Sequence, residues 1–337
     1  MQRRLKRLKA LPLLLLPAAF ILISLCIGRY PVSLSKVMEI LRNGITGTLD
    51  PSNDIYRNVI WEIRMPRAVL GALVGGALGV SGASLQGLFK NPLVSPGILG
   101  VTSGAGFGAA VAILLFGATA VVYPFALGFG ILAVFLSYLI GRTYNTAPTI
   151  MLVLGGVIVS SIFAALISFA KYAADPYEQL PSIVFWMMGS LANAGYHDII
   201  TAGPIIIAGS LGLYLVRWRI NVLSMGDKEA RTLGIDTRIA KGTIVVSATM
   251  ATAGAVCVSG TIGWVGLIMP HIGRMLVGND NRILIPVSFS LGACFLILVD
   301  TMSRVMTGSE IPLGILTSLI GGPFFIYLLK KTKAKGW

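Results

Sequence analysis

Charged residues are scarce in this 337-residue sequence: Asp, Glu, Lys and Arg make up 12% of it, whereas 55% of the residues are hydrophobic. Ordinary soluble domains carry about twice that charged fraction. The composition therefore excludes a chain that is surrounded mainly by water. Since a helix needs about 20 residues to cross a bilayer, the length accommodates about ten crossings. We predict an all-α polytopic membrane protein in which residues 1–337 form a single transmembrane domain.

The residues that most often carry catalysis or bind metals are scarce as well. The two histidines, His197 and His271, are far apart in the sequence, and the three cysteines lie in apolar runs without metal-ligand spacing. The sequence contains no G-x-x-x-x-G-K-[S/T] motif for phosphate binding. We therefore predict that the chain is not an enzyme, has no catalytic or metal site, binds no cofactor and cannot hydrolyse ATP by itself.

The apolar runs contain almost no carboxylates. A transporter driven by ions usually places Asp, Glu or Lys near the middle of its membrane spans. The main exception here is Asp300, which lies towards the end of its run, with Arg304 four residues later in an order that favours a local ion pair. This pattern favours an importer energised by a partner, and an ion-coupled secondary transporter is the alternative from a different class.

Apolar runs long enough to cross a membrane recur along the whole chain. The run 262–277 is short and contains Pro270, His271 and Arg274, which predicts a tilted or broken helix that lines a cavity. Glycines also repeat every four residues at Gly71, Gly75 and Gly79, a spacing that lets helix backbones approach closely. The predicted spans are residues 10–28, 66–88, 96–117, 120–141, 148–169, 198–216, 240–260, 262–277, 283–304 and 312–329.

The distribution of basic residues predicts the orientation in the bilayer. The net charge of +14 would suit nucleic acid binding, but the 27 Lys and Arg lie at helix ends and in loops rather than on one solvated face, so no nucleic acid partner is predicted. With ten spans, both termini lie on one side, which carries 19 of the 27 basic residues. The positive-inside bias therefore places both termini in the cytoplasm. The other side keeps Arg29, Lys36, Arg42, Arg57, Arg64, Arg67, Lys171 and Arg304.

Four segments, in order along nearly the whole chain, carry a family resemblance. The first is IRMPR (63–67), followed by GASLQGLFKNPL (82–93) and PGILGVTSGA (96–105). The others are GDKEARTLG (226–234), GWVGLIMPHIGR (263–274), and Asp300 and Arg304 with EIPLGILT (310–317). Together they resemble the permease subunits of the ABC importers for iron-siderophore, haem and cobalamin, most closely the ferric-siderophore permeases.

The resemblance implies a ten-helix permease of the bacterial cytoplasmic membrane. Such a subunit pairs with a second, homologous or identical permease around a central pathway. Two cytoplasmic ATPase subunits, which hold ATP and Mg, would dock on one side, and an extracytoplasmic substrate-binding protein would deliver the ligand on the other. The expected function is uptake of a ferric siderophore, with cobalamin or haem as alternatives.

The cytoplasmic stretch 217–241 gains a role from the resemblance, namely ATPase coupling. Gly226 and Gly234 would divide it into two short helices, and small residues such as Gly226 and Ala230 would let them enter a groove on the partner. The alternative is a solvated basic loop beside anionic lipid. The predicted coupling residues are Gly226, Glu229, Ala230, Leu233 and Gly234.

The resemblance also implies a cytoplasmic gate in two loops, although ordinary turns would look much the same. Its predicted residues are Asn91, Pro92, Leu93, Val94, Asn145 and Thr146.

Arg64, Arg67 and Arg304 match positions at which similar permeases receive glutamates of the binding protein. The three-residue spacing of Arg64 and Arg67 would place both on one helix face. The alternatives are anchoring at lipid headgroups and, for Arg304, simple pairing with Asp300.

Overall fold

A computed structural model describes residues 2–46, 55–142 and 149–333, and every regular element in these ranges is a helix. The long elements are α1 (Gln2–Cys26), α4 (Met65–Phe89), α5 (Val101–Phe116), α6 (Val122–Gly141), α7 (Thr149–Ala173), α9 (Tyr196–Met225), α11 (Thr237–Ser259), α12 (Val265–Val277), α13 (Asn281–Met306) and α14 (Leu313–Lys333). The short ones are α2 (Leu34–Thr46), α3 (Ile55–Arg57), the π-helix η1 (Asn58–Arg64), the 3₁₀-helix η2 (Pro96–Leu99), α8 (Gln179–Met188) and α10 (Asp227–Thr232).

Each predicted span overlaps one of the long helices. Six helical segments of the described chain are long and apolar enough to cross a membrane: Ile55–Phe89, Val122–Gly141, Thr149–Ala173, Tyr196–Met225, Thr237–Ser259 and Asn281–Met306. The other spans correspond to shorter apolar helices. The all-helical membrane fold is therefore confirmed, while the number of crossings and the cytoplasmic location of the termini stay predictions.

Helix α4 is the central helix of the bundle. It packs against α13, α9, α11 and α12. In the helical segment Ile55–Phe89, of which α4 is the main part, 83% of the most apolar 18-residue stretch is buried inside the chain. Its glycines permit this packing: a Cβ atom on Gly75 would overlap the backbone of Gly292 on α13, and one on Gly79 would overlap the backbone of Ser288. The predicted glycine stripe therefore does bring helix backbones together.

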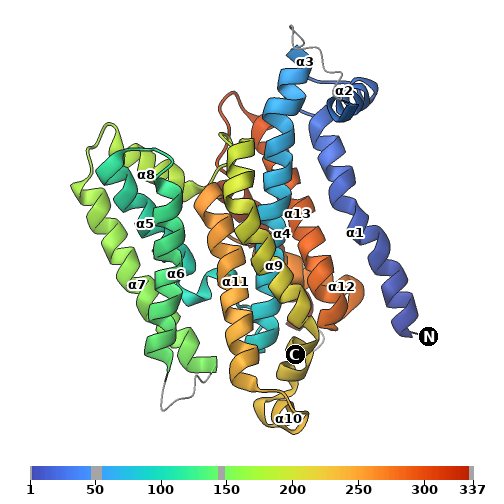
Figure 1. Cartoon of the computed structure of the whole chain (residues 1–337), viewed down its shortest axis with the longest axis vertical. Helices are drawn as coiled ribbons and strands as arrows, with labels where there is room; N and C mark the ends of the chain where they lie inside the picture. Colours follow the sequence, from blue (N-terminus) through green and yellow to red (C-terminus); the bar gives the residue numbers. More distant parts are fainter. Residues whose placement is uncertain (1, 47–54, 143–148, 334–337) are drawn as a thin grey trace.

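Helices α5, α6 and α7 form a second group, which lies beside α11 in Figure 1, with α1 on the opposite side of the molecule. Gly104 and Gly108 of α5 face the backbone of α6 so closely that no side chain would fit. The short helix α10 extends beyond the bundle at the end to which the N-terminal part of α1 also points (Figure 1). This end is the predicted cytoplasmic side.

Candidate transport cavity and partner-contact sites

A cavity of about 670 Å³ lies between the central helices and the α5–α7 group. Its volume falls within the range of roughly 300–1,000 Å³ that is typical of small-molecule sites. The chain breaks its helices around this space: Ser95 precedes η2, and Gly100 between η2 and α5 adopts a left-handed conformation with φ of 86°. Gly156 of α7 touches the backbone of Ile98 so closely that only glycine fits. The glycines therefore shape the wall of the cavity.

Hydroxyl groups, not charges, supply the polar character of this cavity. None of the described residues that line it is charged, whereas seven carry hydroxyls: Ser95, Thr102, Ser103, Ser160, Ser161, Thr252 and Thr261. The Thr252 hydroxyl is buried and has no hydrogen-bond partner among the described residues. A buried hydroxyl without a partner is uncommon, and this one has almost no exposed surface, so a solute in the cavity meets the other hydroxyl groups instead. Such a wall can hydrogen-bond a passing solute without holding it by charge.

Trp264 borders the cavity in a backbone conformation that side chains of its size rarely adopt. Its φ is 67°, and it precedes α12, whose first residues Gly266 and Leu267 also line the cavity. The indole packs on Gly321 of α14 and lies 6.2 Å, between ring centroids, from Phe325. Positive φ in a bulky residue is a genuine outlier that clusters at functional sites. The prediction that the segment 262–277 lines a cavity is confirmed at its beginning.

A buried polar network closes the predicted cytoplasmic end of α4. The side-chain amide of Gln86 donates to the carbonyl oxygens of Val94 (3.1 Å) and Gly266 (3.2 Å), and its oxygen accepts from Arg274 at 2.5 Å. The loop that follows α4 is thereby tied to α12. Neither Gln86 nor Arg274 had a role predicted from the sequence. A polar amide within an apolar helix was the signal that could have identified Gln86.

This network holds part of the predicted gate. Val94 is buried and Leu93 is about half exposed, while the Asn91 side chain accepts a hydrogen bond from the Leu93 amide at 2.9 Å. The other predicted gate residues, Asn145 and Thr146, lie outside the described residues. The gating role itself stays a prediction.

The predicted coupling segment differs from expectation in its helices. Helix α9 continues to Met225, well past the predicted end at residue 216, and one short helix, α10, follows instead of two. Gly226 separates them with φ of 150°, and Gly234 after α10 has φ of 76°. Both glycines therefore occupy backbone conformations that other residues rarely adopt.

The surface of the coupling segment also differs from expectation. Ala230 is fully buried in the apolar cluster that includes Leu223 and Ile235. Its small size permits this packing within the subunit. Its role in letting the segment enter a groove on the partner stays a prediction. Both apolar and charged residues face outwards: Met225 is 64% exposed and Leu233 is 61% exposed, and the charged residues Lys228, Glu229 and Arg231 are exposed as well.

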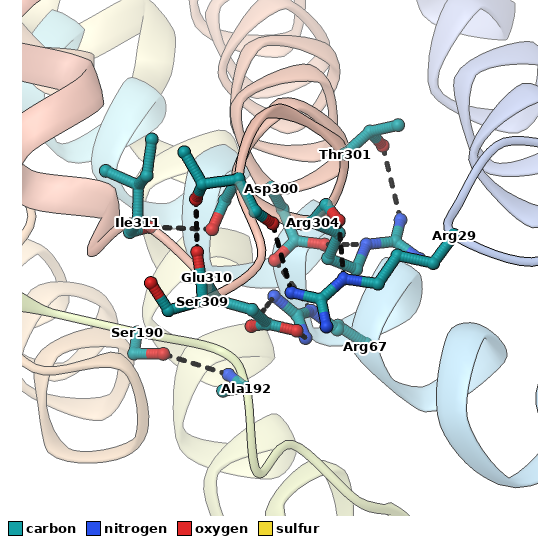
Figure 2. Close-up of polar contacts among 12 residues, drawn as sticks. Arg29, Arg67, Ser190, Ala192, Asp300, Thr301, Arg304, Ser309, Glu310 and Ile311 are labelled. Carbon is teal, nitrogen blue, oxygen red and sulfur yellow. Dashed lines mark hydrogen bonds and ion pairs between the residues drawn. The ribbon is translucent and has the colours of Figure 1, made fainter.

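At the opposite end of α4, Arg67 bridges two carboxylates. Its Nε donates to Asp300 at 2.7 Å, and its two terminal nitrogens donate to the two oxygens of Glu310 at 2.9 and 2.7 Å (Figure 2). The side chains of Arg67 and Asp300 are 3% and 2% exposed, and that of Glu310 is 32% exposed. Burial would raise the pKa of Glu310, but hydrogen bonding and the positive charge of Arg67 hold it below its ordinary value.

Arg304 extends this cluster to α1. Its Nε lies 3.3 Å from the second oxygen of Asp300, and its Nη2 donates to Ser24 at 2.8 Å. Arg29 donates to the carbonyl oxygens of Gly308 (2.5 Å) and Thr307 (3.1 Å) in the loop that carries Glu310. The cluster therefore joins α1, α4, α13 and the loop before α14. The predicted pairing of Asp300 with Arg304 is confirmed.

The comparison with known families identifies the chain. A model described as the FecCD transport family matches residues 14–331. This chain belongs to the FecCD transport family. It is a permease subunit of an ABC importer, as the motifs predicted.

Named relatives of this FecCD permease differ in their substrates. The molybdate import system permease protein MolB of Haemophilus influenzae is 41% identical over 337 residues, which cover 98% of this chain and 97% of MolB. The cobalamin import system permease protein BtuC of Halobacterium salinarum is 41% identical over 278 residues, which cover 82% of this chain and 74% of that BtuC. Other relatives are named as permeases for iron chelatin and hemin.

A solved structure shares the fold. It shows a metal-chelate type ABC transporter in an inward-facing conformation and superposes with a TM-score of 0.85 at 37% identity. The match covers 96% of this chain and 99% of the solved chain.

The geometry of the FecCD permease places the three predicted docking arginines inside the chain. Arg64 is 4% exposed and donates to the carbonyl oxygens of Leu25 and Tyr30, each at 2.6 Å, whereas Arg67 turns to Asp300. The two side chains therefore have separate partners, contrary to the expectation of one shared surface. All three guanidinium groups are engaged within this subunit. Docking of a binding protein on them stays a prediction.

Proposed function

We propose that this FecCD permease and a second permease subunit form the pathway of an ABC importer for a ferric siderophore. In this proposal two cytoplasmic ATPase subunits supply the energy, and an extracytoplasmic binding protein supplies the ligand. The importer operates in the cytoplasmic membrane of a bacterium. Neither ATP hydrolysis nor a resident cofactor is assigned to this chain.

The cavity beside Trp264 is the observation that carries the proposal. In a metal chelate the organic chelator surrounds and coordinates the metal, and its organic surface contacts the protein. A wall of hydroxyl and apolar groups can therefore accommodate the chelate without metal ligands from the protein. Transport also requires contacts that are weak enough to release the solute. Charged groups on the cavity wall would hold a charged chelate more firmly. Because none of the described lining residues is charged, the cavity suits a solute that passes through rather than one that stays bound.

Energy coupling is assigned to the surface around α10. The exposed side chains of Met225, at the end of α9, and of Leu233, just after α10, provide apolar surface on either side of α10. The Glu229 side chain is exposed on α10 itself. An apolar contact with a polar rim is the usual composition of a subunit interface. We assign the contact with the ATPase to these exposed residues rather than to the buried Ala230.

Molybdate is a second candidate substrate, because MolB matches almost the full length of this chain. A small oxyanion would accept hydrogen bonds from hydroxyl groups on the cavity wall, such as those of Thr102, Ser103 and Ser160. Cobalamin and haem are alternatives within the same mechanism. An ion-coupled transporter is the alternative from another class.

Uptake measurements separate these candidates. Cells that lack the gene should lose uptake of a radioactive ferric siderophore while keeping molybdate uptake, and the wild-type gene should restore it. Loss of molybdate uptake alone would replace the siderophore by the oxyanion. Proteoliposomes that contain the permeases, the ATPase and the binding protein should transport only with ATP. Transport by the permease alone, driven by an ion gradient, would refute the ABC mechanism.

A further inference from the structure

Gln86 lies beneath the hydroxyl-lined cavity, on its predicted cytoplasmic side. On α4 the cavity is lined by Leu78, and Gln86 follows about two helical turns later, roughly 12 Å closer to the cytoplasmic end. Gln86 carries a polar amide although it is only 3% exposed. Buried amides are almost always hydrogen-bonded, so the partners of Gln86 indicate its role.

The partners of the Gln86 amide nitrogen belong to two segments of the cavity wall. The nitrogen donates to the carbonyl oxygen of Val94 at 3.1 Å and to that of Gly266 at 3.2 Å. Gly266 lines the cavity, and Val94 precedes Ser95, which lines it too. Gln86 therefore joins the two segments from the cytoplasmic side. We use the term floor for these two segments of the cavity wall, residues 91–95 and 265–267.

A proline explains why α12 needs the contact with Gln86. In a regular helix the carbonyl oxygen of Gly266 would accept a hydrogen bond from the backbone of residue 270. Pro270 has no N–H to donate, and the Gln86 amide supplies a hydrogen bond to this oxygen from α4. Membrane helices tolerate proline where a neighbouring group satisfies the freed carbonyl. The contact therefore holds the beginning of α12 on α4.

Arg274 fixes the orientation of the Gln86 amide. Its Nη2 donates to the side-chain oxygen of Gln86 at 2.5 Å. An amide group accepts through its oxygen and donates through its nitrogen, whereas arginine only donates. Because Arg274 occupies the oxygen, the amide presents its nitrogen to the two carbonyl oxygens of the floor. Arg274 therefore acts through Gln86.

The loop half of the floor lies directly against α12. A Cβ atom on Gly266 would overlap the ring of Pro96, which follows the loop. Inside the loop, the Asn91 side chain accepts a hydrogen bond from the Leu93 amide at 2.9 Å. This bond shapes the loop but does not connect it to another helix, whereas the Gln86 amide connects it to α12. The position of the loop on α12 therefore depends on Gln86.

We propose that Gln86, oriented by Arg274, is the positioning residue that keeps the floor of the cavity closed towards the cytoplasm. This inference rests on the proposed passage of a solute through the cavity. A solute that leaves towards the cytoplasm has to pass the floor, so the loop has to separate from α12. The hydrogen bond from Gln86 to Val94 or to Gly266 then has to break. Bonds between uncharged groups are individually weak in net terms, which permits the floor to open and close repeatedly.

A cysteine reporter in the cavity wall tests the proposal in the full-length permease. Ser103→Cys introduces a thiol at a lining residue with little change in size, and the permease without this change gives the background from the native cysteines. An impermeant thiol reagent is applied to inside-out vesicles, which expose the cytoplasmic side, and to right-side-out vesicles, which expose the outer side. Neither solute nor ATP is added. Siderophore uptake is measured separately, so this proposal and the proposed function can fail independently.

Two substitutions of Gln86 should open the floor. Gln86→Met removes the donor and keeps the volume, whereas Gln86→Glu keeps an acceptor for Arg274 but has no donor for the two carbonyl oxygens. Each should accelerate labelling from the cytoplasmic side roughly 10- to 30-fold, as expected for the loss of two neutral hydrogen bonds, and from the outer side by less than about twofold.

The matched control is Gln179→Met. It removes a glutamine hydrogen bond of 3.2 Å to the carbonyl oxygen of Leu114. Gln179 belongs to α8, which lies at the end of the bundle away from α10 (Figure 1). This variant should leave labelling from the cytoplasmic side unchanged.

Arg274 provides a second pair of variants that keep Gln86. Arg274→Met frees the amide to rotate and should accelerate labelling from the cytoplasmic side, whereas Arg274→Lys keeps a charged donor and should label at nearly the wild-type rate. Unchanged cytoplasmic labelling in both Gln86 variants would overturn the proposal. Equal acceleration from both sides would also overturn it, since that indicates a general loosening of the fold, as would acceleration by Gln179→Met. If the Gln86 variants do not insert into the membrane, wild-type labelling of Arg274→Met overturns it.

Discussion

Replacing Arg67 by methionine should destabilise the folded permease, because it removes a cation from between two carboxylates. Arg67 makes three hydrogen bonds of 2.7–2.9 Å to Asp300 and Glu310. Without it, Glu310 can turn to water, since it is about one-third exposed, whereas Asp300 is 2% exposed and cannot. Breaking a buried ion pair typically costs about 3–5 kcal/mol. Because Asp300 keeps Arg304 at 3.3 Å, we expect a loss of about 3 kcal/mol.

Equilibrium unfolding of the purified protein in mixed detergent micelles, followed by circular dichroism, measures this loss. The matched control is Arg42→Met, because Arg42 is an exposed arginine of α2 on the same predicted side of the membrane. The control should change the free energy of unfolding by less than about 0.5 kcal/mol. The double variant Arg67→Met/Glu310→Gln should lose less free energy of unfolding than the sum of the losses of the two single variants, because both residues belong to one network.

The same variants decide between a structural and a docking role for Arg67. If Arg67 served mainly to receive a partner's carboxylate, its loss would lower the affinity for the binding protein. The free energy of unfolding would then change by less than about 1 kcal/mol, as for an exposed ion pair. That combination of results would refute the reasoning from the buried cluster.

Three further predictions concern acid stability, coupling and topology. The pKa of Glu310 is depressed in the folded state, so the stability that its carboxylate contributes is present above its ordinary pKa and is lost as the pH falls through the depressed value. The variant Glu310→Gln should therefore have a thermal midpoint that depends less on pH in the acid range. A pH dependence equal to that of the wild type would contradict this prediction. Leu233→Asp, at an exposed site, should prevent co-purification of the ATPase while the thermal stability of the permease stays unchanged. Ala230→Glu, at a fully buried site, should lower the thermal stability of the permease. Equal stability of the two variants would count against the burial argument. A single cysteine at Asp175 should react with an impermeant thiol reagent applied outside intact cells and one at Lys333 should not, and the opposite labelling would reverse the proposed orientation.

The helices were predictable from the sequence because membrane insertion depends on local composition. Every apolar run of suitable length became a helix, and even the short segment around Pro270 formed α12. The end of α9 was predicted too early for a related reason. Arg217 and Arg219 marked the end of the apolar run, but a helix can continue beyond hydrophobic sequence, and α9 extends to Met225. Hydrophobicity indicates where lipid contact ends, not where backbone hydrogen bonding ends.

The sites were less predictable because their geometry depends on residues far apart in the chain. Arg67 and Glu310 are separated by 243 positions, and Gln86 and Arg274 by 188. Ala230 looked like a contact for a partner, yet it packs inside its own subunit. Short motifs in the sequence contain these residues, but a motif does not show which way each side chain faces.

The sequence by itself determined that this permease lies in a lipid bilayer, that it is helical and to which family it belongs. Each of these properties depends on composition or on short local motifs. Only the tertiary structure decided which groups are buried and which are free. It closed the arginine cluster, and it lined the cavity beside Trp264 with uncharged residues in the part of the chain that the structure describes. These properties arise from packing between distant helices, where the cost of burying a charge or an unpaired polar group selects one arrangement.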